Sequence, residues 1–235
     1  MNNTEFLAKT KESFYKYLET GPRSNEKLKV LHGAIAKDLK ERLGEEYEVH
    51  SLGYGNSKEE NMTGRYMKKR VDISIEKNNE IIGAIALKFI MRNYSQNSNN
   101  YFENMLGETS NIRTAGKPYF QIIILPSQVP YFNKDKEVTK IEKVTKNNFS
   151  KYIQLSHDNI SEFMHTPNKT LLYLIDIPIP EKDKIPNEKM YKKYYKSNNK
   201  FTITPHEATY DIGNTIIYND YEKFIDKVMH YIKSM

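Results

Sequence analysis

The chain contains no cysteine and no tryptophan among its 235 residues. Without cysteine it can form neither a disulfide bond nor a thiolate metal site. It has no apolar run near the roughly 20 residues that a membrane-spanning helix needs. Its first residues also lack the basic and then apolar layout of a signal peptide. These absences exclude a disulfide-stabilised scaffold, and we expect a cytoplasmic protein.

Two common site motifs are missing as well. Gly53 and Gly55 form too short and isolated a pair for a phosphate-binding loop. The histidines are widely separated and include no i, i+4 pair, so their spacing predicts no zinc site. No histidine is therefore assigned a role. The six histidines are at positions 32, 50, 157, 165, 206 and 230.

The residues that are present are typical of a folded, basic domain. Hydrophobic residues make up 38% of the chain and aromatic residues 12%, which is enough to bury one sizeable core. We expect a single domain over residues 1–235. The formal charge of +6 favours a polyanionic partner such as nucleic acid.

Hydrophobic periodicity predicts alternating helices and strands. Helices are expected at 4–18, 28–43, 100–113, 147–155 and from 219 or 220 onward. Strands are expected at 47–52, 119–125 and 171–177, with a β-hairpin at 71–90 and a loop at 53–64. In the helix at 100–113, Phe102, Leu106 and Ile112 should face inward. This order predicts an α/β fold with a central mixed, partly antiparallel sheet flanked by helices.

The hairpin is the most informative segment. Side chains alternate between the two faces of a strand, so Asp72 and Ser74 should share one face with Ala84, Ala86 and Lys88. The opposite, apolar face would consist of Val71, Ile73, Ile75, Ile85, Leu87 and Phe89. A carboxylate and an ammonium group that meet on the polar face can hold a divalent cation and a phosphate.

An aspartate on one strand and a lysine on the next resemble the PD-(D/E)XK nuclease superfamily, which contains most type II restriction endonucleases. The resemblance covers about residues 28–125 and rests on Asp72, the spacer Leu87 and Lys88. It implies a core of helix, three antiparallel strands, helix and strand. It also implies that carboxylates and the Leu87 carbonyl bind Mg²⁺, while Lys88 orients water or offsets phosphate charge.

The chain departs from this pattern at Ala86, where the family has aspartate or glutamate. The acidic residue has moved to the following helix, or Ala86 replaces a glutamate and inactivates the chain, or the resemblance does not hold. On the helix, Glu103 is better placed than Glu108 by its spacing from Lys88. The expected catalytic residues are Asp72, Lys88 and Glu103, and the expected Mg²⁺ ligands are Asp72, Leu87 and Glu103.

Basic and amide-rich segments surround this pattern, and their side chains can bind phosphates or base edges. The expected contacts to double-stranded DNA are Arg65, Lys68, Lys69, Arg70, Arg92, Asn93, Gln96, Asn97 and Asn100. Further recognition segments are expected in about residues 126–218, including the basic, aromatic cluster at 191–196. The same basic segments could instead be solvated surface.

A type II restriction endonuclease that cuts both strands of a palindrome would act as a homodimer. Two alternatives stay open. One is a non-catalytic DNA-binding module on a nuclease scaffold, and the other is a repair or recombination nuclease that recognises DNA structure.

Overall fold

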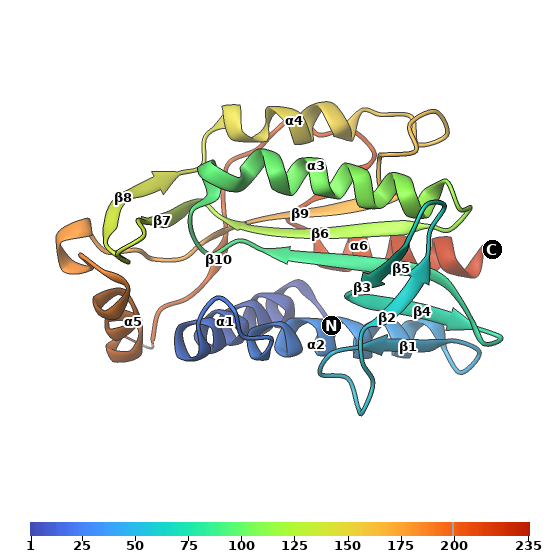
Figure 1. Ribbon diagram of the computed structural model, residues 1–235, viewed down its shortest axis with the longest axis horizontal. Coiled ribbons are helices and arrows are strands. Elements are labelled where there is room, and N and C mark those ends of the chain that lie inside the picture. The colour runs from blue at the N-terminus through green and yellow to red at the C-terminus, as the bar shows by residue number, and fades with distance from the viewer. Residues whose placement is uncertain (199) are drawn as a thin grey trace.

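The computed structural model describes residues 1–198 and 200–235, and in them seven strands form the main sheet (Figure 1). Its strands, in spatial order, are β1 (Glu48–Ser51), β4 (Ile73–Lys77), β5 (Glu80–Phe89), β6 (Tyr119–Pro126), β9 (Lys169–Asp176) and β10 (Thr204–Pro205), with β11 (Ile216–Tyr218) also paired to β9. Strands β1, β4 and β5 are antiparallel, whereas β5, β6 and β9 are parallel. The predicted α/β class with a mixed sheet is confirmed.

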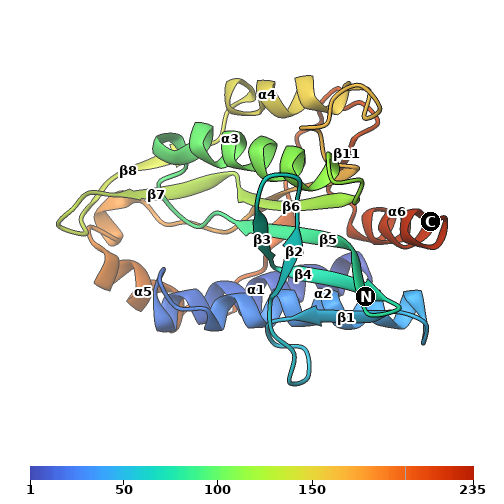
Figure 2. The ribbon, with the colours of Figure 1, turned by 45° about the vertical axis from the view of Figure 1, so that its right-hand side comes forward.

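Helices cover both faces of the sheet (Figures 1 and 2). One face packs against α1 (Asn3–Thr20), α2 (Glu26–Leu43) and α6 (Tyr221–Lys233), and the other against α3 (Tyr94–Arg113) and α4 (Lys146–Ser156). Every residue of β6 is buried, as expected for a central parallel strand covered on both sides. None of the helices in the described residues is both long and apolar enough to cross a membrane.

Smaller elements extend from this core. They are the hairpin β2 (Glu60–Thr63) and β3 (Lys68–Val71), the pair β7 (Gln128–Phe132) and β8 (Val138–Lys143), the short helix η1 (Lys182–Lys184) and α5 (Glu188–Ser197). The segment 53–64, predicted as a loop, therefore contains a strand. The segment 126–218, expected to hold recognition additions, supplies β9 to the centre of the sheet, so the core extends well beyond residue 125.

The β4–β5 hairpin forms as the sequence predicts. Asn78 and Asn79 have positive φ angles of 53° and 62°, and Lys77 pairs with Glu80 on either side of them. Two successive left-handed residues form the two-residue turn that matches the strand twist, and asparagine tolerates that conformation.

The predicted alternation of apolar and polar side chains along the two strands of this hairpin is only partly correct. Ile73, Ile75, Ile85 and Leu87 share one apolar cluster, but Val71 lies in another. The reason is that the chain passes at Asp72 from the small β2–β3 sheet to the main sheet, so the alternation breaks there. The face expected to be polar is also largely buried, because α3 covers it. Ser74 and Ala84 on that face have no exposed surface.

Helix α3 begins earlier than predicted, at Tyr94, so the amide-rich segment forms its first turns. The fully buried face of α3 includes Met105 and Ile112, whereas Phe102 packs edge-on against Tyr152 of α4. The inward face is thus rotated relative to the prediction from Phe102 and Leu106.

The cluster at 191–196 forms most of α5, in which Lys193 and Lys196 are exposed, and its role at the edge of a DNA-binding cleft stays a prediction. Tyr191 and Tyr195 are buried and their rings meet at a centroid distance of 5.0 Å. Burial raises the pKa of both phenols. These tyrosines therefore attach α5 to the core.

Candidate functional site

Asp72 and Lys88 line the same pocket, which has a volume of about 350 Å³. It lies between α2, the β3–β4 junction, the C-terminal end of β5, the first half of β6, and α3. Ala86 and Glu108 also line it. Four cationic side chains line the pocket, which favours an anionic ligand. They are Lys27, Lys69, Arg70 and Lys88.

Asp72 is held in place by the backbone of β5. The last residue pair of the β4–β5 ladder at this end is Ile73 and Ile85, and beyond it the Leu87 N–H donates to Asp72 Oδ2 at 2.7 Å. Because the N–H and C=O of one strand residue point to the same side, the Leu87 carbonyl also faces this side of β5. Burial raises the pKa of Asp72, while the Leu87 N–H and the Lys88 charge oppose the rise.

Lys88 is exposed, and its Nζ lies 4.9 Å from the centre of the Tyr101 ring on α3. A cation over an aromatic face is attracted by the ring quadrupole, so Tyr101 helps to orient the ammonium group. Lys88 therefore lies at the solvent-accessible rim of the pocket that contains Asp72.

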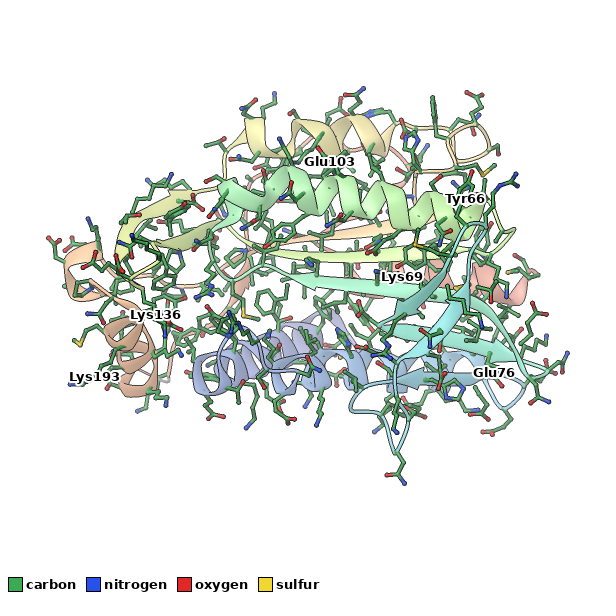
Figure 3. The ribbon with its side chains drawn as sticks, viewed as in Figure 1. Tyr66, Lys69, Glu76, Glu103, Lys136 and Lys193 are labelled. Atoms are coloured by element: carbon green, nitrogen blue, oxygen red, sulfur yellow. The ribbon has the colours of Figure 1, made fainter. Side chains whose placement is uncertain are left out.

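The prediction that Glu103, rather than Glu108, lies in the site with Asp72 and Lys88 is wrong. Glu103 is exposed on the side of α3 near α4, as Figure 3 shows. Burial lowers the pKa of Lys151 on α4, and the charge of Glu103 partly opposes that change. Glu108 lines the pocket, forms an ion pair with Lys69, and accepts a hydrogen bond from Tyr119 Oη at 3.4 Å. Residues five apart on an α-helix point about 140° apart, so the two glutamates cannot share one site.

Sequence reasoning missed His32 and Glu59. His32 on α2 has no exposed surface, and burial lowers its pKa to about 4, so it is neutral at pH 7. Glu59 lies just before β2, and its pKa is raised by burial and then by the Asp72 charge. The possible ligand atoms of His32, Glu59 and Asp72 all lie within 4.8 Å of one another. These three residues could hold a metal ion.

Gln121 was also missed. It pairs with Ala86 in the parallel β5–β6 ladder and lines the pocket. It is 4% exposed, and its Nε2 has no hydrogen-bond partner among the described residues. An unpaired amide donor in a cation-lined pocket can bind a phosphate oxygen. The only sequence signal is one polar residue inside the apolar run at 119–125.

The β2–β3 hairpin carries the first group of predicted DNA contacts, and its tip rests on the end of α3 (Figures 2 and 3). Asn111 Oδ1 accepts from the Tyr66 and Met67 N–H groups at 2.9 and 3.3 Å, and Asn111 Nδ2 donates to the Met67 carbonyl at 2.9 Å. A Cβ on Gly64 would lie only 2.2 Å from Asn111 Nδ2, so a larger residue there would displace the Asn111 side chain.

These contacts leave the tip side chains pointing into solvent. Tyr66 is 75% exposed and Met67 is 67% exposed. Arg65, Lys68 and Arg70 beside them are exposed too, whereas Lys69 pairs with Glu108. The hairpin therefore presents two apolar side chains within a group of cations.

The second group of predicted contacts is only partly available. Asn93 Nδ2 donates to the Phe132 carbonyl and its Oδ1 accepts from the Phe132 N–H, each at 2.9 Å. Asn97 Nδ2 donates to the Asn93 carbonyl. Asn93 thus joins α3 to β7, and its predicted role in reading bases is wrong for this conformation.

The rest of this group lies nearer the surface. Arg92 is half-buried, with its guanidinium 5.7 Å from the centre of the Phe132 ring. Gln96 and Asn100 are exposed on the first turns of α3, and Gln96 Oε1 accepts from Tyr131 Oη at 3.1 Å. These three side chains can still meet a ligand that lies along α3.

No protein-family model, no curated protein and no solved structure matches the chain. What the pocket can do follows from its own residues.

Proposed function

We propose that this protein hydrolyses phosphodiester bonds in double-stranded DNA with the help of a divalent cation, as a type II restriction endonuclease does. The observation that carries the proposal is the convergence of Asp72, Lys88 and Glu108 on one cation-lined pocket. A carboxylate beside an ammonium group, within a basic rim, suits a phosphate accompanied by a cation.

The order of elements around the pocket supports the same reading. Helix α2 is followed by the antiparallel strands β1, β4 and β5, then by α3 and the parallel strand β6. This is the order that the resemblance to the PD-(D/E)XK superfamily implies. Asp72 immediately precedes the second of these antiparallel strands, and Lys88 lies near the end of the third.

The residues of the pocket would divide the chemistry among them. Asp72, fixed by the Leu87 N–H, holds the cation, for which the resemblance implies Mg²⁺. That cation, when bound, polarises the scissile phosphate and lowers the pKa of a bound water. Lys88 offsets charge that develops on the phosphate. Gln121 donates to a phosphate oxygen, and Glu108 holds Lys69 at the entrance.

DNA binding would use the β2–β3 hairpin and the exposed side of α3. Exposed cations position a protein on the phosphate backbone, and apolar side chains at a tip can enter a groove. Cutting both strands of a palindrome calls for two copies of the pocket related by a two-fold axis, so the proposal includes a homodimer.

Ala86 favours a second candidate, a DNA-binding module that does not cut. Its methyl group lines the pocket at the position where the resemblance requires a carboxylate. Without that carboxylate, the pocket could hold a phosphate and leave it intact.

Plasmid cleavage with added Mg²⁺ or Mn²⁺ tests the proposal. We expect discrete fragments from the unmodified chain, with Asp72→Asn and Lys88→Met each slowing cleavage by about 100-fold or more. Asp72→Asn keeps an oxygen for the Leu87 N–H, and Glu103→Gln serves as the matched exposed control. DNA retardation without cutting, both in the parent and in Ala86→Glu, would establish the binding module instead. Nicking without discrete fragments would indicate a structure-selective nuclease.

A further inference from the structure

Three chain segments bring metal-binding side chains to one point. His32 comes from the middle of α2, Glu59 from the residue before β2, and Asp72 from the β3–β4 junction. Their candidate ligand atoms lie within 4.8 Å of one another. At metal–ligand distances of about 2.0–2.2 Å, ligands on opposite sides of an ion lie up to about 4.4 Å apart. Neighbouring ligands of a four-coordinate ion lie only about 3.4 Å apart, so shifts of about one ångström would bring all three ligand atoms to the ion.

His32 gives the independent sign of a ligand. It has no exposed surface, it lines the pocket, and neither of its ring nitrogens has a hydrogen-bond partner in the described part of the chain. A structural core histidine normally satisfies its nitrogens, because a buried polar group without a partner costs about 1–3 kcal/mol. A cation bound to the lone pair of one ring nitrogen would give buried His32 the partner that it lacks.

We propose that His32, Glu59 and Asp72 bind one first-row transition-metal cation, such as Mn²⁺ or Zn²⁺, more tightly than Mg²⁺. The inference rests on the proposed function in sharing Asp72, and it specifies which ion the pocket takes. Mg²⁺ prefers oxygen ligands in octahedral geometry and keeps several waters. An imidazole nitrogen shifts the preference toward transition metals.

The arrangement also leaves room for a substrate. One Asp72 oxygen accepts the Leu87 N–H, so the other can bind the ion. Three protein ligands leave at least one coordination position for water or a phosphate oxygen, as in catalytic metal sites. That open position would face the cation-lined part of the pocket.

Isothermal titration of the full, EDTA-treated chain with MnCl₂, ZnCl₂ or MgCl₂, in the absence of DNA, tests this inference. We expect one site that binds Mn²⁺ and Zn²⁺ at least tenfold more tightly than Mg²⁺. His32→Leu should weaken binding of Mn²⁺ and Zn²⁺ by about 10–100-fold. It should change Mg²⁺ binding by less than about threefold, because the carboxylate oxygens remain.

A second variant guards against misfolding of His32→Leu. Glu59→Gln removes a ligand charge from a half-exposed side chain, and it should also weaken Mn²⁺ binding about tenfold. Glu60→Gln, at the adjacent exposed position, is the matched control and should bind like the parent. Equal or tighter binding of Mg²⁺, or unchanged Mn²⁺ and Zn²⁺ affinity in both variants, would overturn the inference.

These readouts separate the inference from the nuclease proposal. Transition-metal binding that depends on His32, in a protein that cuts no DNA, supports the metal site and refutes the nuclease. DNA cleavage that proceeds with Mg²⁺ and is unchanged in His32→Leu supports the nuclease and refutes the metal site.

Discussion

His32 should make the metal-free protein sensitive to acid. The buried ring has a folded-state pKa of about 4 against an ordinary value of 6.5, so the unfolded chain takes up the proton first. The free energy of unfolding is therefore fully retained above about pH 6.5 and falls as the pH drops toward 4. At about 1.36 kcal/mol per pKa unit, the loss due to His32 is about 2 kcal/mol by pH 5 and about 3 kcal/mol near pH 4.

Replacing His32 with leucine should remove this loss and also raise stability at neutral pH. Leucine occupies the apolar surroundings without leaving two ring nitrogens unpaired, so the gain at pH 7 should be about 1–3 kcal/mol. The difference in free energy of unfolding between His32→Leu and the parent should then be about 2 kcal/mol larger at pH 5 than at pH 7. Asp72 and Glu59, whose pKa values burial raises, act in the opposite direction and are present in both chains.

Urea unfolding in EDTA, followed by far-UV circular dichroism at pH 7 and pH 5, measures both effects. His230→Leu on the exposed side of α6 is the control for a helical histidine, and its stability should stay within about 0.5 kcal/mol of the parent. The reasoning fails if His32→Leu is less stable than the parent at pH 7 and the difference in free energy of unfolding is the same at pH 5. The imidazole of His32 would then not be an unpaired, neutral group. With EDTA left out, added Zn²⁺ should stabilise the parent more than the variant, because the folded parent binds it more tightly.

Three further outcomes test other parts of the structure. Ala86→Glu should strengthen Mn²⁺ binding and speed plasmid cleavage by about tenfold, equivalent to about 1.4 kcal/mol; no change in either would remove Ala86 from the site. Asn93→Ala should lower the urea-derived free energy of unfolding by about 1–3 kcal/mol, because it breaks two bonds to Phe132; unchanged stability with altered sequence preference would restore its DNA-reading role. Tyr66→Ala should leave stability within about 0.5 kcal/mol. It should also weaken duplex binding in fluorescence anisotropy by about fivefold, near 1 kcal/mol; unaltered affinity would exclude the hairpin tip.

Local patterns in the sequence predicted the parts of the fold that depend on neighbouring residues. The Asn78–Asn79 turn, the buried strand at 119–125 and the apolar stripe of α2 each carry their signal within a short window. That Asp72 and Lys88 belong to one site could be predicted from the hairpin signal. The exact register could not, because an irregularity between Ile75 and Glu76 shifts the register that the two-residue turn starts.

The missed site residues depend on contacts between distant segments. His32 occupies a core position on α2, and only the packing of α2 against the β3–β4 junction shows that its ring lies beside Asp72. Glu59 belongs to a segment whose strand forms only by pairing with β3. Glu103 was chosen by its distance along the chain from Lys88, whereas the rotation of α3 decides which glutamate faces the pocket. That rotation depends on how α3 packs against β6 and α4.

Two unpaired polar groups of the core fit the ligand that we propose, a phosphate with its divalent cation. In the described residues, buried side-chain atoms without a partner belong to six residues, and His32 and Gln121 are the two of them that line the pocket. A neutral imidazole offers a lone pair, which suits a cation, while the Gln121 amide offers N–H donors, which suit an anion. No single monatomic ion satisfies both groups. A phosphate that carries its own divalent cation does, and a nucleic-acid backbone at a metal site supplies that combination.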